Sequence, residues 1–311
     1  MSKKRLLVLG VLTAVTLMVS SAGAQGSRLN GEGLTVGYTT PGLDNEYWAQ
    51  TKAYAEAEAD RLGVNLVFLA AETGDVSDHL DIINDFIAQG VDAVVIAPVD
   101  SKGIIPGIEA LNAAGIPVVG ADILPEGGHL IAKVQVDARV GGRLVGEYIL
   151  SQKGPDGKLF LEDSDVYVDI GEIRHSGAYT LLQENGWEVV RQPLSPYGRG
   201  PAQDMAETVF TAHPDLDAYY TLNDDTALGV VQAAQAMGMT DVVICGYDAL
   251  PEAVEAIRNG QMGCTIYQDA NALVSWAIQM AVLYNDAPWA GTVEYYIPPT
   301  LVTPDNVDSY K

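Results

Sequence analysis

The chain has 311 residues, of which 41 are acidic and 17 basic, so its net charge at neutral pH is −24. Nucleic acids and anionic lipids are bound through Lys and Arg, and this balance argues against both as partners. Hydrophobic residues make up 48% of the chain, enough for a full core, and the length predicts one large or two medium-sized domains.

The first 24 residues have the layout of a secretory signal peptide. Three basic residues at 3–5 precede an apolar stretch at 6–19, and small residues at 22–24 offer a cleavage site. The stretch is shorter than the roughly 20 residues that cross a bilayer, so a retained anchor is the less favoured alternative. We expect cleavage near Ala24 and a periplasmic or secreted protein with no direct membrane insertion.

Short apolar runs and helical patterns alternate along the next hundred residues. The runs are rich in β-branched residues and nearly continuous, as parallel strands covered on both faces should be, and Gly63 and Gly90 end the first two helices. The expected strands are 34–40, 64–71, 91–98 and 116–122, and the expected helices are 45–62, 76–89 and one around 108–114.

The alternation pauses where a strand leads directly into a long helix, with Asp137 at the junction, and then resumes. This order predicts an α/β protein with two doubly wound parallel-sheet lobes of similar size. No Pro- or Ser-rich linker separates them, so we expect short crossings that act as a hinge. The later strands are expected at 158–163, 187–192, 216–222, 241–248 and 263–268, with helices through 176–185, 202–213, 226–237 and 252–259, a last helix at 270–286 and a tail at 293–304.

The two cysteines, Cys245 and Cys264, lie in apolar, strand-like runs. In an oxidising compartment they could form a disulfide, or they could be two buried thiols, since cysteine is among the most buried residue types. The four histidines show no metal-ligand spacing, and no cofactor is predicted.

Short polar residues stand at the ends of the expected strands. Helix capping would explain any one of them, whereas a ligand site would explain them together, because open α/β sheets bind ligands at the carboxyl ends of their strands. These residues are Thr39, Thr40, Asn45, Asp122, Asn223, Asp248 and Gln268.

Aromatic residues accompany these polar groups. Tyr47 and Trp48 follow Asn45, and Tyr197 lies in a loop with Pro and Gly neighbours. Carboxylates and amides accept hydrogen bonds from sugar hydroxyls, and flat rings cover the C–H faces of a sugar. Core packing is the alternative for each aromatic. The combination indicates a sugar site in a cleft between two sheets.

Several motifs, in register, resemble the periplasmic ribose-binding-protein family, the sugar-binding components of ABC importers. The likeness extends from about Leu34 to Asn285, and its longest motifs are 211–229 and 242–260. It implies the type I periplasmic binding protein fold, a monosaccharide or polyol ligand, a membrane ABC permease as partner and a monomer. The lobes are expected at 33–136, completed by about 269–297, and at 137–268, completed by about 298–311.

Carried over residue by residue, the resemblance implies ligand-binding positions at Asn45, Tyr47, Trp48, Asp122, Arg174, Tyr197, Asn223, Asp248 and Gln268. The motif around Arg174 aligns to within one residue, so His175 is its alternative. Asp224 or Asp225 is expected to cap the helix that begins at Thr226. The family's pentose binders often carry Arg directly after the aspartate that matches Asp122, where this chain has Ile123. This departure argues against D-ribose itself and leaves room for a ligand with a less polar edge, or for a polyol.

The expected function is a solute-binding protein that captures a sugar or polyol by lobe closure and delivers it to an ABC importer. The alternative is a sugar sensor that presents its ligand to a chemoreceptor or sensor kinase. A transcription regulator would need a DNA-binding helix pair where the signal peptide stands. An enzyme is not expected, because Asp122 and Asp248 resemble a glycosidase carboxylate pair only in type and no nucleophile–base pair supports that function.

Overall fold

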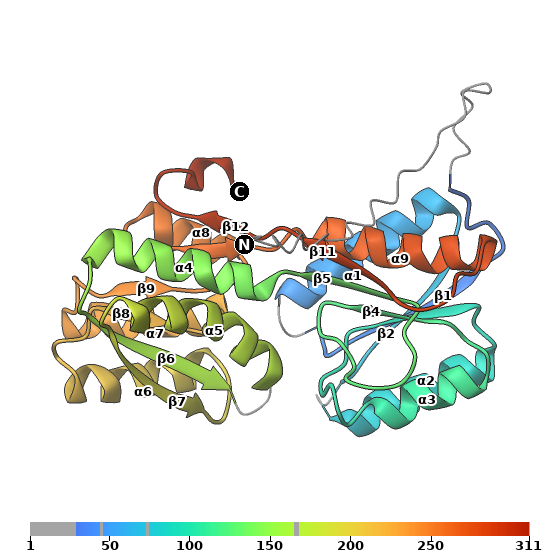
Figure 1. Cartoon of the computed structure of the whole chain (residues 1–311), viewed down its shortest axis with the longest axis horizontal. Helices are drawn as coiled ribbons and strands as arrows, with labels where there is room; N and C mark the ends of the chain where they lie inside the picture. The colour runs from blue at the N-terminus through green and yellow to red at the C-terminus, as the bar shows by residue number, and fades with distance from the viewer. Residues whose placement is uncertain (1–28, 44–45, 73–74, 165–167, 311) are drawn as a thin grey trace, which may run out of the picture.

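The fold was taken from a computed structural model, which describes residues 29–43, 46–72, 75–164 and 168–310. The predicted signal peptide and Asn45 lie outside the described residues. Two α/β lobes lie side by side, with the N-terminal lobe on the right of Figure 1 and the C-terminal lobe on the left. Among the described residues, no helix combines the length and apolar character needed to cross a membrane.

The N-terminal lobe is built on a six-stranded sheet in which every neighbouring pair is parallel, in the order β11-β5-β4-β3-β1-β2. Buried valines and isoleucines dominate its central strands, which explains their nearly continuous apolar sequence. The strands are β1 (Thr35–Thr40), β2 (Asn65–Ala70), β3 (Ala93–Ile96), β4 (Val118–Ala121), β5 (Ala132–Val136) and β11 (Val293–Ile297).

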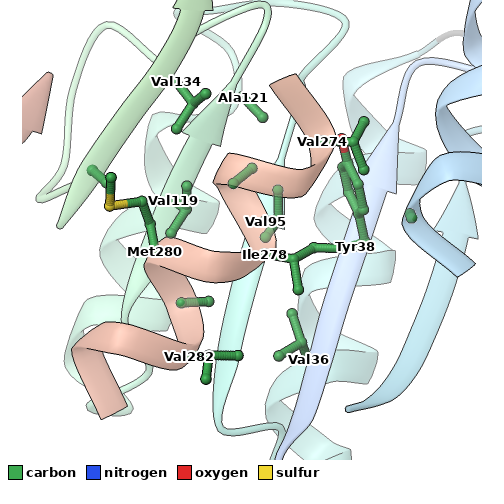
Figure 2. Close-up of a cluster of buried hydrophobic side chains, with 14 of the residues drawn as sticks. Val36, Tyr38, Val95, Val119, Ala121, Val134, Val274, Ile278, Met280 and Val282 are labelled. Atoms are coloured by element: carbon green, nitrogen blue, oxygen red, sulfur yellow. The ribbon is translucent and has the colours of Figure 1, made fainter. Parts of the chain in front are cut away.

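Helices cover both faces of this sheet. One face carries α1 (Glu46–Leu62) and α9 (Ala270–Asp286), and the other carries α2 (Val76–Gln89) and α3 (Ile105–Ala113). Figure 2 shows Ile278 and its neighbours on α9, which lies in front of the strands that carry Val36, Val95 and Val119. The last long helix of the chain therefore completes the core of the first lobe.

The C-terminal lobe has a parallel four-stranded sheet in the order β7-β6-β8-β9, from β6 (Lys158–Ser164), β7 (Glu188–Leu194), β8 (Ala218–Tyr220) and β9 (Val243–Cys245). Isolated parallel bridges join β9 to the segment of β10 (Thr265–Tyr267), and β12 (Thr300–Val302) pairs antiparallel with β10. The predicted tail thus contains two strands, β11 in one lobe and β12 in the other.

Five helices flank this second sheet. Two clusters of buried hydrophobic residues form the core of this lobe. One contains residues of α4 (Ala138–Lys153) and α5 (Val168–Glu184), and the other contains residues of α6 (Arg199–Ala212), α7 (Asp224–Met237) and α8 (Pro251–Arg258). A 3₁₀ turn, Val307–Ser309, follows β12.

The chain passes between the sheets at short segments after β5, after β10 and after β11. At the first, Asp137 caps α4 by accepting a 3.1 Å hydrogen bond from the Val140 N–H. We propose on this basis that the lobes are bounded at about residues 136/137, 268/269 and 297/298. Three short crossings restrict relative motion to a hinge.

Candidate functional site

A pocket lies between the two lobes, where the carboxyl ends of both sets of parallel strands meet. The space between its walls is about 410 Å³, counted out into the solvent at its open mouth. The N-terminal lobe supplies Tyr47, Trp48, Asp122 and Ile123, and the C-terminal lobe supplies Ile170, Arg174, Leu222, Asn223 and Asp248.

Two elements position the wall from the N-terminal lobe. Tyr47 and Trp48 lie in the first turn of α1, are only 5% and 7% exposed, and pack edge to face. Asp122 directly follows β4 with a φ of 65°, a conformation that Asp tolerates better than most residues. The Tyr47 hydroxyl donates a hydrogen bond to Oδ2 of Asp122. This carboxylate is therefore oriented by a neutral donor.

Arg174 is the centre of the opposite wall. Its Nη1 donates a 2.7 Å hydrogen bond to the Leu222 carbonyl, its Nη2 lies 3.6 Å from Oδ1 of Asp248, and its guanidinium lies 4.0 Å from the centre of the Tyr247 ring. Its Nε is buried and has no hydrogen-bond partner among the described residues. A fixed guanidinium with an unused donor is suited to a ligand hydroxyl.

Close helix packing brings Arg174 to this position. A Cβ atom on Gly142 of α4 would lie 1.7 Å from the Arg174 carbonyl oxygen, and one on Gly177 of α5 would lie 2.2 Å from the carbonyl of Arg139. Glycine at both positions is therefore required for α5 to approach α4.

Asp248 is held from a second direction. Gln268 donates a 2.7 Å hydrogen bond from Nε2 to Oδ1 of Asp248, and the backbone at Asp248 has a φ of 113°. Positive φ at a non-glycine residue is strained and persists where the surroundings enforce it. Both pocket aspartates thus occupy enforced backbone conformations.

Burial dominates the titration of the pocket acids. It raises the pKa of Asp248 to about 7, although the charge of Arg174 acts in the opposite direction. Burial also raises the pKa of Asp122, against the hydrogen bond from Tyr47 and the charge of Arg174. Burial acts to lower the pKa of Arg174, but Asp248 and other neighbours outweigh it and leave the pKa raised. The guanidinium is therefore charged throughout the accessible pH range.

The Asn223–Asp225 triplet differs from its prediction. Asn223 lines the pocket and is itself the helix cap, since its Oδ1 accepts a 3.0 Å hydrogen bond from the Thr226 N–H and α7 begins at Asp224. Asp224 is fully buried and accepts hydrogen bonds from the Leu250 N–H and the Thr265 hydroxyl, and Asp225 forms an ion pair with Arg199. The expectation that Asp224 or Asp225 caps the helix is therefore wrong, because the helix starts two residues earlier.

Other predicted residues lie near the pocket without lining it. Gln268 stands behind Asp248 and orients it. The Tyr197 hydroxyl is buried in the C-terminal lobe near Thr226 and Glu162, because its loop turns the ring toward α7. His175 is buried with its Nδ1 3.0 Å from Asp163 and is not among the residues that line the pocket. Of the two alternatives, Arg174 faces the pocket.

The sequence prediction missed the apolar part of the pocket. Ile170 and Leu222 line it, and Leu250 packs with Tyr47, Trp48 and Ala97 in a cluster that joins the lobes. The position of Leu222, directly before the polar triplet 223–225, is the sequence signal that could have predicted an apolar residue in the pocket. Cys245 and Cys264 are both buried free thiols at neighbouring positions of the sheet. No group of three potential metal ligands occurs among the described residues.

Comparison with known proteins places this arrangement in context. The family model described as "Periplasmic binding protein domain" matches residues 36–287. The chain belongs to this family. Its relative in Pseudomonas aeruginosa, the D-ribose/D-allose-binding protein, is 30% identical over 294 residues, which cover 90% of this chain and 91% of the relative.

Two solved structures of ABC transporter solute-binding proteins have the same fold. The protein from Actinobacillus succinogenes, with bound D-allose, is 26% identical with a TM-score of 0.83, and the match covers 89% of this chain and all of that one. The protein from Bacillus halodurans, with bound myo-inositol, is 26% identical with a TM-score of 0.82, and the match covers 90% and 98%.

Proposed function

We propose that this protein is an extracytoplasmic, non-catalytic solute-binding protein that captures a monosaccharide or cyclic polyol between its lobes and delivers it to a membrane ABC permease. The observation that carries the proposal is the pocket itself, in which an indole, a phenol and a carboxylate of one lobe face a guanidinium, an amide and a second carboxylate of the other. Relatives whose names or bound ligands are ribose, allose and myo-inositol support this ligand class.

The pocket groups match the chemistry of a ring that carries several hydroxyls. Asp122 and Asp248 accept hydrogen bonds, Arg174 donates them, and Asn223 can do both. Each bond to a charged group contributes about 1.5–3 kcal/mol, and a micromolar Kd corresponds to about −8.2 kcal/mol. Three or four such bonds, with an aromatic wall, are sufficient after the cost of association and closure is subtracted.

Closure of the lobes is the proposed capture step. Neither wall surrounds a ligand alone, and Leu250 of one lobe packs on Tyr47 and Trp48 of the other. A ligand that contacts both walls favours the closed arrangement over an open one. We expect the protein to act as a monomer, to be exported to the periplasm after cleavage near Ala24, and to present its closed form to the permease.

The test is a ligand screen of the exported protein. Thermal shift against pentoses, hexoses, deoxy-sugars, amino sugars and cyclitols should identify ligands, since a compound that binds only the folded state raises the Tm. Calorimetry on each hit should then give a Kd, and incubation with product analysis should return the ligand unchanged. Absence of binding to every member, or conversion of a bound sugar to products, contradicts the proposal.

A further inference from the structure

The charges that line the pocket do not balance. Asp122 and Asp248 supply two carboxylates, and Arg174 is the single cationic side chain among the described residues that line the cavity. The internal segments outside the described residues, 44–45, 73–74 and 165–167, contain no Lys or Arg. When both carboxylates are ionised, the pocket therefore has one negative charge in excess.

Arg174 is committed to one of the two carboxylates. Its Nη2 lies 3.6 Å from Asp248, and its Nη1 is held by the Leu222 carbonyl. Asp122, which is 8% exposed, makes no ion pair with any described residue. Its Oδ2 accepts the hydrogen bond from Tyr47, and its Oδ1 accepts none from the described part of the chain. The excess charge thus belongs to Asp122.

The residue next to Asp122 increases this imbalance. Ile123 lines the pocket beside the carboxylate and packs on the cluster formed by Tyr47, Trp48 and Leu250. It therefore places hydrocarbon where a basic side chain would neutralise Asp122. A buried carboxylate without a cationic partner is unfavourable, and a charge-assisted bond to a ligand cation removes that cost.

We propose that the ligand carries a primary ammonium group that lies against Asp122, which makes it an amino sugar or an amino cyclitol. The inference rests on the proposed function and narrows its ligand class. The ammonium donates to the free Oδ1 of Asp122, the neighbouring hydroxyls bond to Arg174, Asn223 and Asp248, and the ring face lies on Trp48. The ligand then completes the charge balance of the closed pocket.

Matched ligands provide the test. Calorimetry would compare D-glucosamine with D-glucose and 2-deoxy-D-glucose, the corresponding amino, hydroxyl and deoxy forms of galactose and mannose, and scyllo-inosamine with scyllo-inositol. In at least one series the amine should bind at least tenfold more tightly than the alcohol, and the deoxy compound should bind no better than the alcohol. An advantage of the alcohol or of the deoxy form in every series that binds overturns the inference and leaves the proposed function intact.

Three variants test whether Asp122 causes the preference for the amine over the alcohol. Ile123→Arg should pair with Asp122 and reduce the amine-to-alcohol preference at least tenfold, and Asp122→Asn should abolish it. Met237→Arg adds the same charge at an exposed site at the far end of α7 from Asn223 and should keep the preference. Circular dichroism of each variant without ligand checks its folding. A preference that survives both pocket variants in folded protein, or that Met237→Arg removes equally, shows that Asp122 does not select the ligand.

Discussion

The two walls of the pocket hold their ligand-binding groups in position in different ways. The wall from the N-terminal lobe is mainly aromatic and apolar, and its one carboxylate is held by a neutral phenol. The wall from the C-terminal lobe includes the apolar Ile170 and Leu222, but its centre is a charged network in which Arg174 pairs with Asp248. Gln268 orients Asp248 from behind the wall. The first wall is kept in place by side-chain packing and the second by electrostatics, so the two should respond to different perturbations.

Removing a member of the charged network should have the largest effect. Asp248→Ala leaves Arg174 without its ion-pair partner in a buried site, and loss of one member of such a pair costs about 2–5 kcal/mol in binding. We expect the Kd, measured by calorimetry, to weaken at least tenfold in a protein that still folds. Asp225→Ala is the matched control, because it removes a carboxylate of the same lobe whose ion pair with Arg199 lies outside the pocket. Equal ligand affinity of the two variants would show that Asp248 does not bind the ligand.

Ligand affinity and protein stability should depend on pH in different ways. Ligand hydroxyls bond best to the ionised form of Asp248, whose pKa is about 7. Affinity should therefore rise as the pH is raised from 5 to 7, by at most about tenfold per unit for one proton, and then level off. The Asp248→Asn variant should lose the part of this slope that Asp248 contributes and keep any part contributed by Asp122, whose pKa is also raised by burial.

The same titration of Asp248 should contribute to stability without ligand in the opposite direction. Burial raises the folded-state pKa of Asp248 and of Glu162 to about 7, well above their unfolded values. Between about pH 4 and 7 each of these two acids binds more protons in the native state than in the unfolded state, so each lowers the free energy of unfolding as the pH rises. Burial lowers the pKa of His79 and of His175, and these two groups act in the opposite direction over the same range. In denaturant titrations Asp248→Asn should remove the contribution of Asp248 to the pH dependence and keep that of Glu162, which lies outside the pocket lining. An Asp248→Asn variant whose stability depends on pH in the same way as that of the parent protein would contradict the raised pKa of Asp248.

Weakening the apolar contact between the lobes should have a smaller effect than these substitutions, and it should act on lobe closure. Leu250→Ala removes a contact of the C-terminal lobe with Tyr47 and Trp48. The loss of part of a buried leucine side chain should destabilise the closed arrangement of the lobes by about 1 kcal/mol. Small-angle scattering of the ligand-free variant should then give a larger radius of gyration than the parent protein, and ligand should reduce it. Leu283→Ala, on the exposed side of α9, should leave the curve unchanged. A parent protein whose curve is unaltered by a ligand that binds would exclude closure.

The smallest effect on affinity should come from the indole. Trp48→Phe keeps an aromatic ring against the ligand and should weaken binding by less than about 1 kcal/mol. It should nevertheless remove most of the ligand-induced change in tryptophan emission, because Trp48 is the pocket tryptophan. Trp187→Phe, in the core of the C-terminal lobe, should retain that change.

Local physics made much of the fold predictable. Nearly continuous β-branched runs mark strands that are covered on both faces, and glycines such as Gly90, with φ of 66°, end helices that no other residue would end as easily. The last helix was predicted at 270–286, which is its extent in the structure. The polar residues at strand ends were also visible, because a parallel sheet has one carboxyl edge.

Long-range contacts decided the rest. Which polar groups meet depends on how helices pack, as with Arg174, which faces the pocket while its neighbour His175 pairs with Asp163. The same holds for Tyr197, turned into its own lobe, and for Leu250, recruited from the opposite one. The sequence by itself determined the strands, the helices and the types of residue at the sheet edge, since these follow from neighbours along the chain. Only the tertiary structure decided which of those residues form one pocket and that Asp122 lacks a cation there, because charge balance in a buried site depends on residues far apart in the sequence.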